Sequence, residues 1–142
     1  MQTSSKILFF LQYVPFAFVA YTTPIVTSSY SNALSSSNQV FQRPDGDIGK
    51  IYYFQAIQVT VSIAGNYIFM SDSVLDTIGY LYDNNFDPSD PYANLIAEDD
   101  DDGDKPLQFR IEMVLQSTHT YFLVVTTHRE SATGTFSISA IG

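Results

Sequence analysis

The sequence contains no cysteine and no tryptophan among its 142 residues. Without cysteine, disulfide bonds, thiol catalysis and cysteine-bound zinc or iron–sulfur centres are excluded. Basic residues are scarce as well, because six Lys and Arg stand against fifteen Asp and Glu and leave a net charge of −9. A field of this sign repels nucleic-acid phosphates and anionic lipid headgroups. A nucleic-acid-binding role is therefore not expected.

The motifs of common enzyme classes are also missing. The chain has no G-x-S-x-G elbow, H-E-x-x-H helix motif, phosphate loop or dinucleotide fingerprint. Its two histidines, His119 and His128, flank one apolar segment, and an extended strand would hold them roughly 30 Å apart. A solvated aspartate cluster offers no shielded acid for glycoside cleavage. The sequence therefore predicts a protein that is not an enzyme.

The residues that are abundant favour β-structure. The chain has ten Tyr and eleven Phe, and 45% of its residues are hydrophobic, enough for one domain with a core. Short strand-like segments follow one another between turn sequences, and no amphipathic helix of useful length interrupts them. We therefore predict an all-β fold, an antiparallel two-sheet β-sandwich or jelly roll of about seven to nine strands.

Alternating apolar residues predict which strand faces point inward. The segment TYFLVVTT, residues 120–127, is instead apolar from Tyr121 to Val125, which predicts a central strand covered on both sides, or at least one far from a sheet edge. In the three alternating segments, the residues predicted to share an inward face are Leu107, Phe109, Ile111, Met113 and Leu115; Ile57, Val59, Val61 and Ile63; and Phe136, Ile138 and Ala140.

The N-terminal segment is predicted to be a signal peptide. Lys6 precedes ILFFLQYVPFAFVAY, which carries no charge and is shorter than the about 20 residues that a membrane-spanning helix needs. We assign residues 1–22 to the signal peptide, 23–29 to a Ser/Thr-rich spacer and 30–142 to the β-sandwich domain. A signal anchor extending to Val26 and a buried strand pair remain alternatives. The protein is expected to be secreted, and to contact a membrane only if the N-terminal segment is retained as an anchor.

The order of motifs resembles a known family. YYFQAIQVTVSIAGNYIFMSDSVLDTIGYLYD is followed by NLIAEDDDDGD, QFRIEMVLQSTHTYFLVVTT and GTFSISA, and together they span about residues 50 to 141. This order resembles the pre-peptidase C-terminal (PPC) domain family. The resemblance implies a secreted β-sandwich that serves as an accessory module and is not itself a catalyst. It also implies calcium binding in some members and collagen binding in collagenase relatives. The segment GDKPLQ departs from the glycine- and asparagine-rich loop of the family.

An acidic turn is the most distinctive local feature, with six carboxylates between residues 98 and 104. Calcium takes six to eight oxygen ligands, and either a bound cation or full hydration would relieve the repulsion here. The EF-hand pattern does not fit, because aligning Gly103 with its invariant glycine puts Phe109 at the last ligand position. A calcium site and a hydrated loop both stay open. The predicted calcium ligands are Asp76, Asp99, Asp100, Asp101, Asp102 and Asp104, although Asp76 could instead cap a turn.

Aromatic residues provide a second candidate surface. Phe86 and Tyr92 lie in the proline-containing segment NNFDPSDPY, where they could hold a sugar or peptide or could pack over a sheet edge. Tyr52, Phe54, Tyr80 and Tyr82 likewise form either a binding face or part of the core. The sequence thus predicts a secreted, calcium-stabilised, non-catalytic module that binds an extracellular protein or polysaccharide. The alternatives are a structural domain without metal and an accessory domain of a secreted peptidase.

Overall fold

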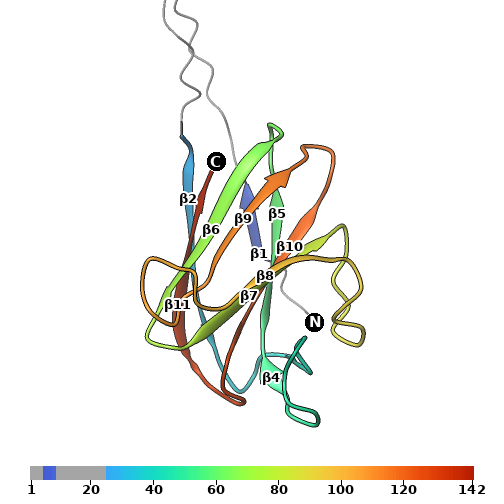
Figure 1. The fold of residues 1–142 in the computed structure, drawn as a ribbon, viewed down its shortest axis with the longest axis vertical. Coiled ribbons are helices and arrows are strands. Elements are labelled where there is room, and N and C mark those ends of the chain that lie inside the picture. The colour runs from blue at the N-terminus through green and yellow to red at the C-terminus, as the bar shows by residue number, and fades with distance from the viewer. Residues whose placement is uncertain (1–4, 9–24) are drawn as a thin grey trace, which may run out of the picture.

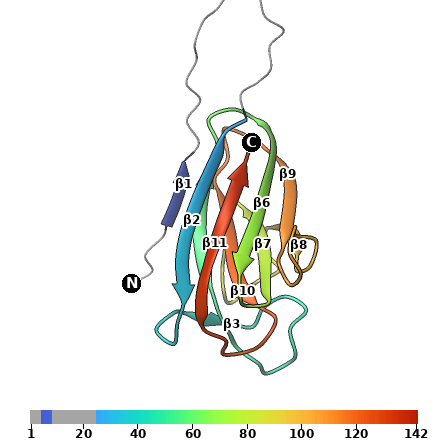
Figure 2. The same cartoon turned by 90° about the vertical axis from the view of Figure 1, so that its left-hand side faces the viewer.

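The computed structural model describes residues 5–8 and 25–142, and over these residues it contains strands and no helix. Two sheets stack face to face (Figures 1 and 2). The first sheet has the order β1-β5-β10-β7-β8 and the second has the order β2-β11-β6-β9, while β3 and β4 form a small separate pair. The strands are β1 (Ser5–Leu8), β2 (Thr27–Leu34), β3 (Val40–Phe41), β4 (Tyr52–Tyr53), β5 (Gln55–Thr60), β6 (Gly65–Ser73), β7 (Thr77–Asp83), β8 (Leu95–Asp99), β9 (Arg110–Leu115), β10 (Tyr121–Thr127) and β11 (Gly134–Ile141).

The predicted fold class is confirmed. Within the described ranges every strand pairing is antiparallel except that of β1 with β5. With β1 set aside, the orders β5-β10-β7-β8 and β2-β11-β6-β9 are those of an eight-stranded jelly roll. The additional strands are the short β1, β3 and β4, which the sequence pattern did not separate from their neighbours.

The main core lies between the two sheets and follows the period-two pattern. Phe136, Ile138 and Ala140 of β11 in the second sheet are buried, as their alternation predicts. Ile57 and Val59 of β5 in the first sheet belong to the same core cluster. Aliphatic and aromatic side chains from both sheets fill this layer; its buried members also include Leu34, Phe69, Leu81, Phe109, Ile111, Leu115 and Leu123.

A second core cluster covers the outer face of the first sheet. Phe41 of β3 and Tyr52 of β4 close over Ile78, Tyr80 and Tyr82 of β7, and Phe54 and Val124 complete the cluster. This cover explains the unbroken apolar run of β10. Leu123 and Val125 face the main core while Val124 faces the second cluster, so the prediction of a central strand covered on both sides is confirmed.

Two residues predicted to face inward do not. Leu107 is 50% exposed and has a positive φ of 64°. It lies before β9, which begins three residues later, at Arg110. The side chain buried at this approach is the polar Gln108. Ile63 is 48% exposed because β5 ends at Thr60 and the chain is already turning. The period-two pattern therefore fails at the far ends of these two segments, although Val61 and Phe109, each one residue outside its strand, are still buried as predicted.

The N-terminal region contains one described strand. Residues 5–8 form β1, which pairs in parallel with β5. The rest of the predicted signal peptide, and the cleavage position, lie outside the described residues. Strand β2 begins at Thr27, so the second sheet starts inside the range predicted as a spacer. No helix in the described part of the chain is long and apolar enough to span a membrane.

Candidate functional site: an acidic pocket beside β8

A pocket of about 230 Å³ opens on the outer face of the first sheet, next to β8. Its floor comes from β7, where alternation turns Ile78 and Tyr80 to the outer face. Its acidic wall comes from the end of β8, where Glu98 lies opposite Tyr80 in the strand register. The full lining consists of Arg43, Asp45, Ile78, Tyr80, Glu98, Asp99 and Asp100. Four acidic residues and one arginine therefore line the pocket beside Ile78 and Tyr80.

Arg43 is held in place by aromatic residues of the second core cluster. Its guanidinium lies 4.7 Å from the ring centre of Tyr52, and its Nη1 donates to the hydroxyl of Tyr80 at 3.4 Å. The Tyr80 hydroxyl in turn donates to the carbonyl of Pro44 at 3.0 Å. The Nε of Arg43 is buried and has no hydrogen-bond partner among the described residues. Arg43 thus joins the loop after β3 to the floor of the pocket.

The environments of Glu98 and Asp99 disfavour the charged forms of their carboxyl groups. Burial raises the pKa of Glu98, and repulsion from Asp45 and a hydrogen bond with it raise this pKa further. Burial also raises the pKa of Asp99. The pKa of Tyr80 is raised to about 12, mainly by burial, so its hydroxyl remains a neutral donor at physiological pH. A cationic group entering the pocket would relieve the repulsion between these carboxylates.

The acidic turn next to the pocket is held by its own first aspartate. Oδ2 of Asp99 accepts hydrogen bonds from the backbone N–H of Asp102 at 3.0 Å and of Arg110 at 2.8 Å. The N–H of Gly103 donates to the carbonyl of Gln108 at 2.7 Å, and a side chain at Gly103 would clash with that carbonyl. Asp99 is therefore a structural anchor of the turn, and glycine at 103 permits the close backbone approach.

The other predicted calcium ligands are distributed around this turn. Asp100, Asp101, Asp102 and Asp104 are exposed. Asp76 is half-buried, and burial raises its pKa; the charge of His128 opposes this shift, while the negative charges of Asp101 and Asp100 add to it.

Nevertheless, the described residues contain no group of three or more His, Cys, Asp or Glu side chains placed to hold a metal ion. Oδ2 of Asp99 already accepts two backbone N–H groups, and Asp100, Asp101, Asp102 and Asp104 are exposed to solvent. Lys105 also pairs with Asp72 of β6 at 2.6 Å, which places a positive charge beside the turn. Calcium binding stays a prediction.

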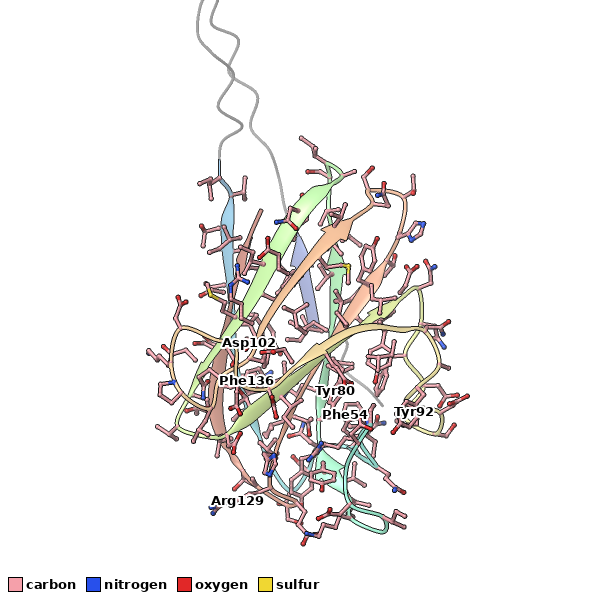
Figure 3. All side chains as sticks on the ribbon, in the orientation of Figure 1. Phe54, Tyr80, Tyr92, Asp102, Arg129 and Phe136 are labelled. Atoms are coloured by element: carbon pink, nitrogen blue, oxygen red, sulfur yellow. The ribbon has the colours of Figure 1, made fainter. Side chains whose placement is uncertain are left out.

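The two aromatic residues of the proline-containing loop have different environments. Phe86 packs against Phe41, Phe54 and Tyr82, with ring centres 4.7 to 5.9 Å apart, so the packing alternative describes it. Tyr92 is 60% exposed, and its hydroxyl accepts a hydrogen bond from the backbone N–H of Asp45 at 3.0 Å. Figure 3 shows Tyr92 on the loop between β7 and β8. Tyr92 therefore contacts the pocket through Asp45, whereas Phe86 is partly buried and packs against the second core cluster.

The two histidines lie at opposite ends of β10, as predicted. His119 Nδ1 lies 2.9 Å from Asp83 Oδ1 before the strand begins, and His128 follows its end. Sequence reasoning missed Arg43 and Asp45 as pocket residues, because Pro44-Asp45-Gly46-Asp47 reads simply as a turn. Glu98 was recognised as part of the acidic turn but not as a site residue. The outward alternation of Ile78, Tyr80 and Tyr82 was the available signal for the floor.

Comparison with known proteins finds solved structures with a similar fold. No protein-family model and no curated protein sequence matches this chain. Among solved structures, the chain is similar to the pre-peptidase C-terminal domain of collagenase from Bacillus anthracis, with a TM-score of 0.54 and 8% identity over 98% of this chain and 95% of that one. It is also similar to PliG from Aeromonas hydrophila, a periplasmic inhibitor of g-type lysozyme, with a TM-score of 0.53 and 11% identity over the whole of both chains. The resemblance to PPC domains thus extends to the fold, which PliG shares.

Proposed function

We propose that this chain is a secreted, non-catalytic β-sandwich module that binds an extracellular protein through the acidic pocket beside β8. The observation that carries the proposal is the pocket itself, in which Asp45, Glu98 and Asp100 surround an apolar floor. A lysine or arginine side chain matches this arrangement, because its alkyl stem fits the floor and its charge meets the carboxylates.

Three further features support a protein partner. The net charge of −9 would speed the approach of a positively charged surface. Exposed Tyr92 beside the pocket is a residue type enriched in protein interfaces. One protein of similar fold, PliG, is described as a lysozyme inhibitor, which provides an example of this fold acting on a protein.

Secretion and calcium are part of the proposal on separate grounds. Secretion is supported by the apolar N-terminal segment and by the periplasmic location given for PliG. Calcium is supported by the concentration of carboxylates between residues 98 and 104 and by the charge repulsion that Asp100 and Asp101 exert on Asp76. A bound ion would order the turn that borders the pocket and would stabilise the folded chain by mass action.

The test is a direct binding assay with the purified full chain immobilised against secreted proteins of high and low isoelectric point, a g-type lysozyme and soluble polysaccharides. We expect basic proteins to bind, with affinity that falls as ionic strength rises. Asp100→Lys should weaken binding roughly tenfold or more, since it places a cation at the pocket rim.

Glu112→Lys is the matched control. It makes the same change in net charge, but Glu112 is an exposed residue of β9 in the second sheet and does not line the pocket. Equal losses in both variants would show that only the general field matters and would contradict the assigned site. Binding of a neutral polysaccharide that is unaffected by salt and by Asp100→Lys would replace the protein partner with a glycan. Absence of binding across the whole set would refute the proposal.

A further inference from the structure

The opposite edge of the first sheet has a different character. Strand β5 pairs with β10 on one side over Gln55–Val59, and among the described strands its other side pairs with β1 alone. Ile57 and Val59 are fully buried in the main core. Without β1, this edge would present the unpaired backbone groups of a strand whose inward side chains are aliphatic.

Strand β1 closes this edge with four residues. Its parallel register joins Lys6 to Gln58 and Ile7 to Val59. Ile7 is only 4% exposed and belongs to the main core. Strand β1 also contacts β2, the edge strand of the second sheet, and Figure 2 shows it alongside β2. The short strand thus covers the seam where the edges of the two sheets meet.

Two properties of β1 favour its replacement by another strand at the β5 edge. Strand β1 has four residues, near the lower limit of strand length, so its ladder with β5 is short. It is also joined to β2 through residues 9–26, a connection far longer than a hairpin turn. The short ladder with β5 and the contacts of Ile7 therefore hold β1 at this edge, and the β5–β10 ladder lies on the other side of β5.

We propose that the β5 edge, together with the facing edge of β2, is a strand-acceptor site for an extended aliphatic peptide in parallel register. In this structure, residues 5–8 fill the site in cis, with Ile7 as the buried anchor. Removal of residues 1–22, as the signal-peptide prediction anticipates, would leave the site open to a partner segment of the same pattern. Backbone pairing would supply affinity, and the cavity left by Ile7 would select an aliphatic side chain.

The first test fixes the register in the full chain. Because the sequence has no cysteine, a Lys6→Cys/Gln58→Cys variant contains one thiol pair, whose Cα atoms are register partners. We expect an intramolecular disulfide on mild oxidation, because neighbouring strands bring opposite Cα atoms within disulfide range. The control variant Lys6→Cys/Gln116→Cys places the second thiol in the turn between β9 and β10. Failure of the first pair to crosslink, or equal crosslinking of both, would overturn the proposal.

The second test asks whether the site accepts a strand in trans. A fluorescent peptide with the sequence of residues 3–10, TSSKILFF, is titrated into the full chain and into its Ile7→Asp variant. The variant should bind the peptide roughly tenfold more tightly than the unchanged chain, because its own strand no longer competes. A peptide with Asp in place of the isoleucine should not bind. Equal affinity for both chains, or indifference to the peptide substitution, would refute the acceptor site.

This site is independent of the acidic pocket. Basic-protein binding should be the same in the Ile7→Asp variant, so a failure of strand acceptance and a failure of the proposed function give different results. If Ile7→Asp prevents folding, the milder Ile7→Ala variant replaces it in the peptide titration. The cysteine pair still tests the register.

Discussion

The two edges of the first sheet are closed by opposite chemistry. At the β8 edge, the carboxylate of Asp99 accepts the N–H of Arg110 from β9, so a charged side chain joins the two sheets. At the β5 edge, the aliphatic side chain of Ile7 fills the corresponding seam next to β2. One sandwich therefore protects one edge with charge and the other with an added strand, which are two established ways of avoiding edge-to-edge association.

Because of this difference, the β8 edge (the acidic edge) and the β5 edge (the aliphatic edge) should respond to different solution conditions. Salt, pH and cations act on the acidic edge, because Glu98 interacts electrostatically with Asp45 and Asp100 in a partly solvated pocket. The aliphatic edge depends on burial and strand pairing, which respond weakly to salt. A ligand at one edge should leave the other unchanged unless it alters the stability of the whole sandwich.

The largest expected difference between the edges comes from the same substitution made at both. Ile57→Ala on β5 removes a fully buried side chain and should cost about 2–5 kcal/mol of unfolding free energy. Ile96→Ala on β8 removes a side chain that is 40% exposed and should cost about 1 kcal/mol or less. Urea unfolding measures both. Equal losses would show that the β8 edge is packed as tightly as the β5 edge.

Calcium should affect only the acidic edge. If the predicted site exists, calcium at a hundred times its dissociation constant should add about 2.7 kcal/mol of stability over EDTA, measured as a rise in Tm. Magnesium at equal ionic strength is the control for screening, and an Asp100→Asn/Asp101→Asn variant should lose the rise. Identical melting temperatures in calcium and in EDTA would refute the predicted calcium site.

A smaller effect is expected from the backbone of the acidic turn. Gly103→Ala should cost about 1–3 kcal/mol, because the added methyl group meets the carbonyl oxygen of Gln108. Gly65→Ala is the matched control, since the nearest atom to its added methyl is 4.0 Å away in Tyr67, and it should change stability by about 1 kcal/mol or less. Thermal melting distinguishes them. If Gly103→Ala is as stable as the control, the close approach at the turn is not required.

The smallest effect is a pH dependence at Glu98. Because its folded pKa is raised by burial and by Asp45, its contribution to stability is full below its ordinary pKa of 4.5 and is lost as pH rises through the folded value. Glu98→Gln should therefore raise Tm at pH 7 and should not raise it at pH 3.5, which thermal melting at the two pH values measures.

Glu112→Gln provides the opposite sign for comparison. Hydrogen bonds from Asn66 and Arg110 lower the pKa of Glu112, so its stabilising contribution is present above its ordinary pKa and is lost as pH falls. This variant should melt at a lower temperature than the unchanged chain at pH 7. The same direction of change in both variants at pH 7 would contradict the assigned environments.

Much of the fold could be predicted because period two and turn chemistry are local signals. Phe136, Ile138 and the run from Tyr121 to Val125 reveal strands and their buried faces directly. Leu107 was placed wrongly because apolar alternation continues past the point where the ladder ends, and sequence alone does not show where hydrogen bonding stops.

The pocket was harder to predict because its parts come from three separate regions. Arg43 and Asp45 follow β3, Tyr80 lies in β7, and Glu98 lies in β8, and only the sheet order brings them together. The acidic turn was recognised from its composition, but the internal role of Asp99 depends on its contact with Arg110, eleven residues along the chain. The parallel pairing of β1 had no local signal, since residues 5–8 lie at the start of an apolar segment typical of a leader.

The most direct test of the proposed function is an NMR titration of the isotopically labelled full chain with a short lysine-rich peptide at low and high ionic strength. The account predicts that backbone signals of Arg43, Asp45, Tyr80 and residues 98–100 shift at low salt, that β5 and the outer face of the second sheet stay unchanged, and that the shifts fade at high salt. Shifts centred elsewhere, or no shifts at low salt, would contradict it.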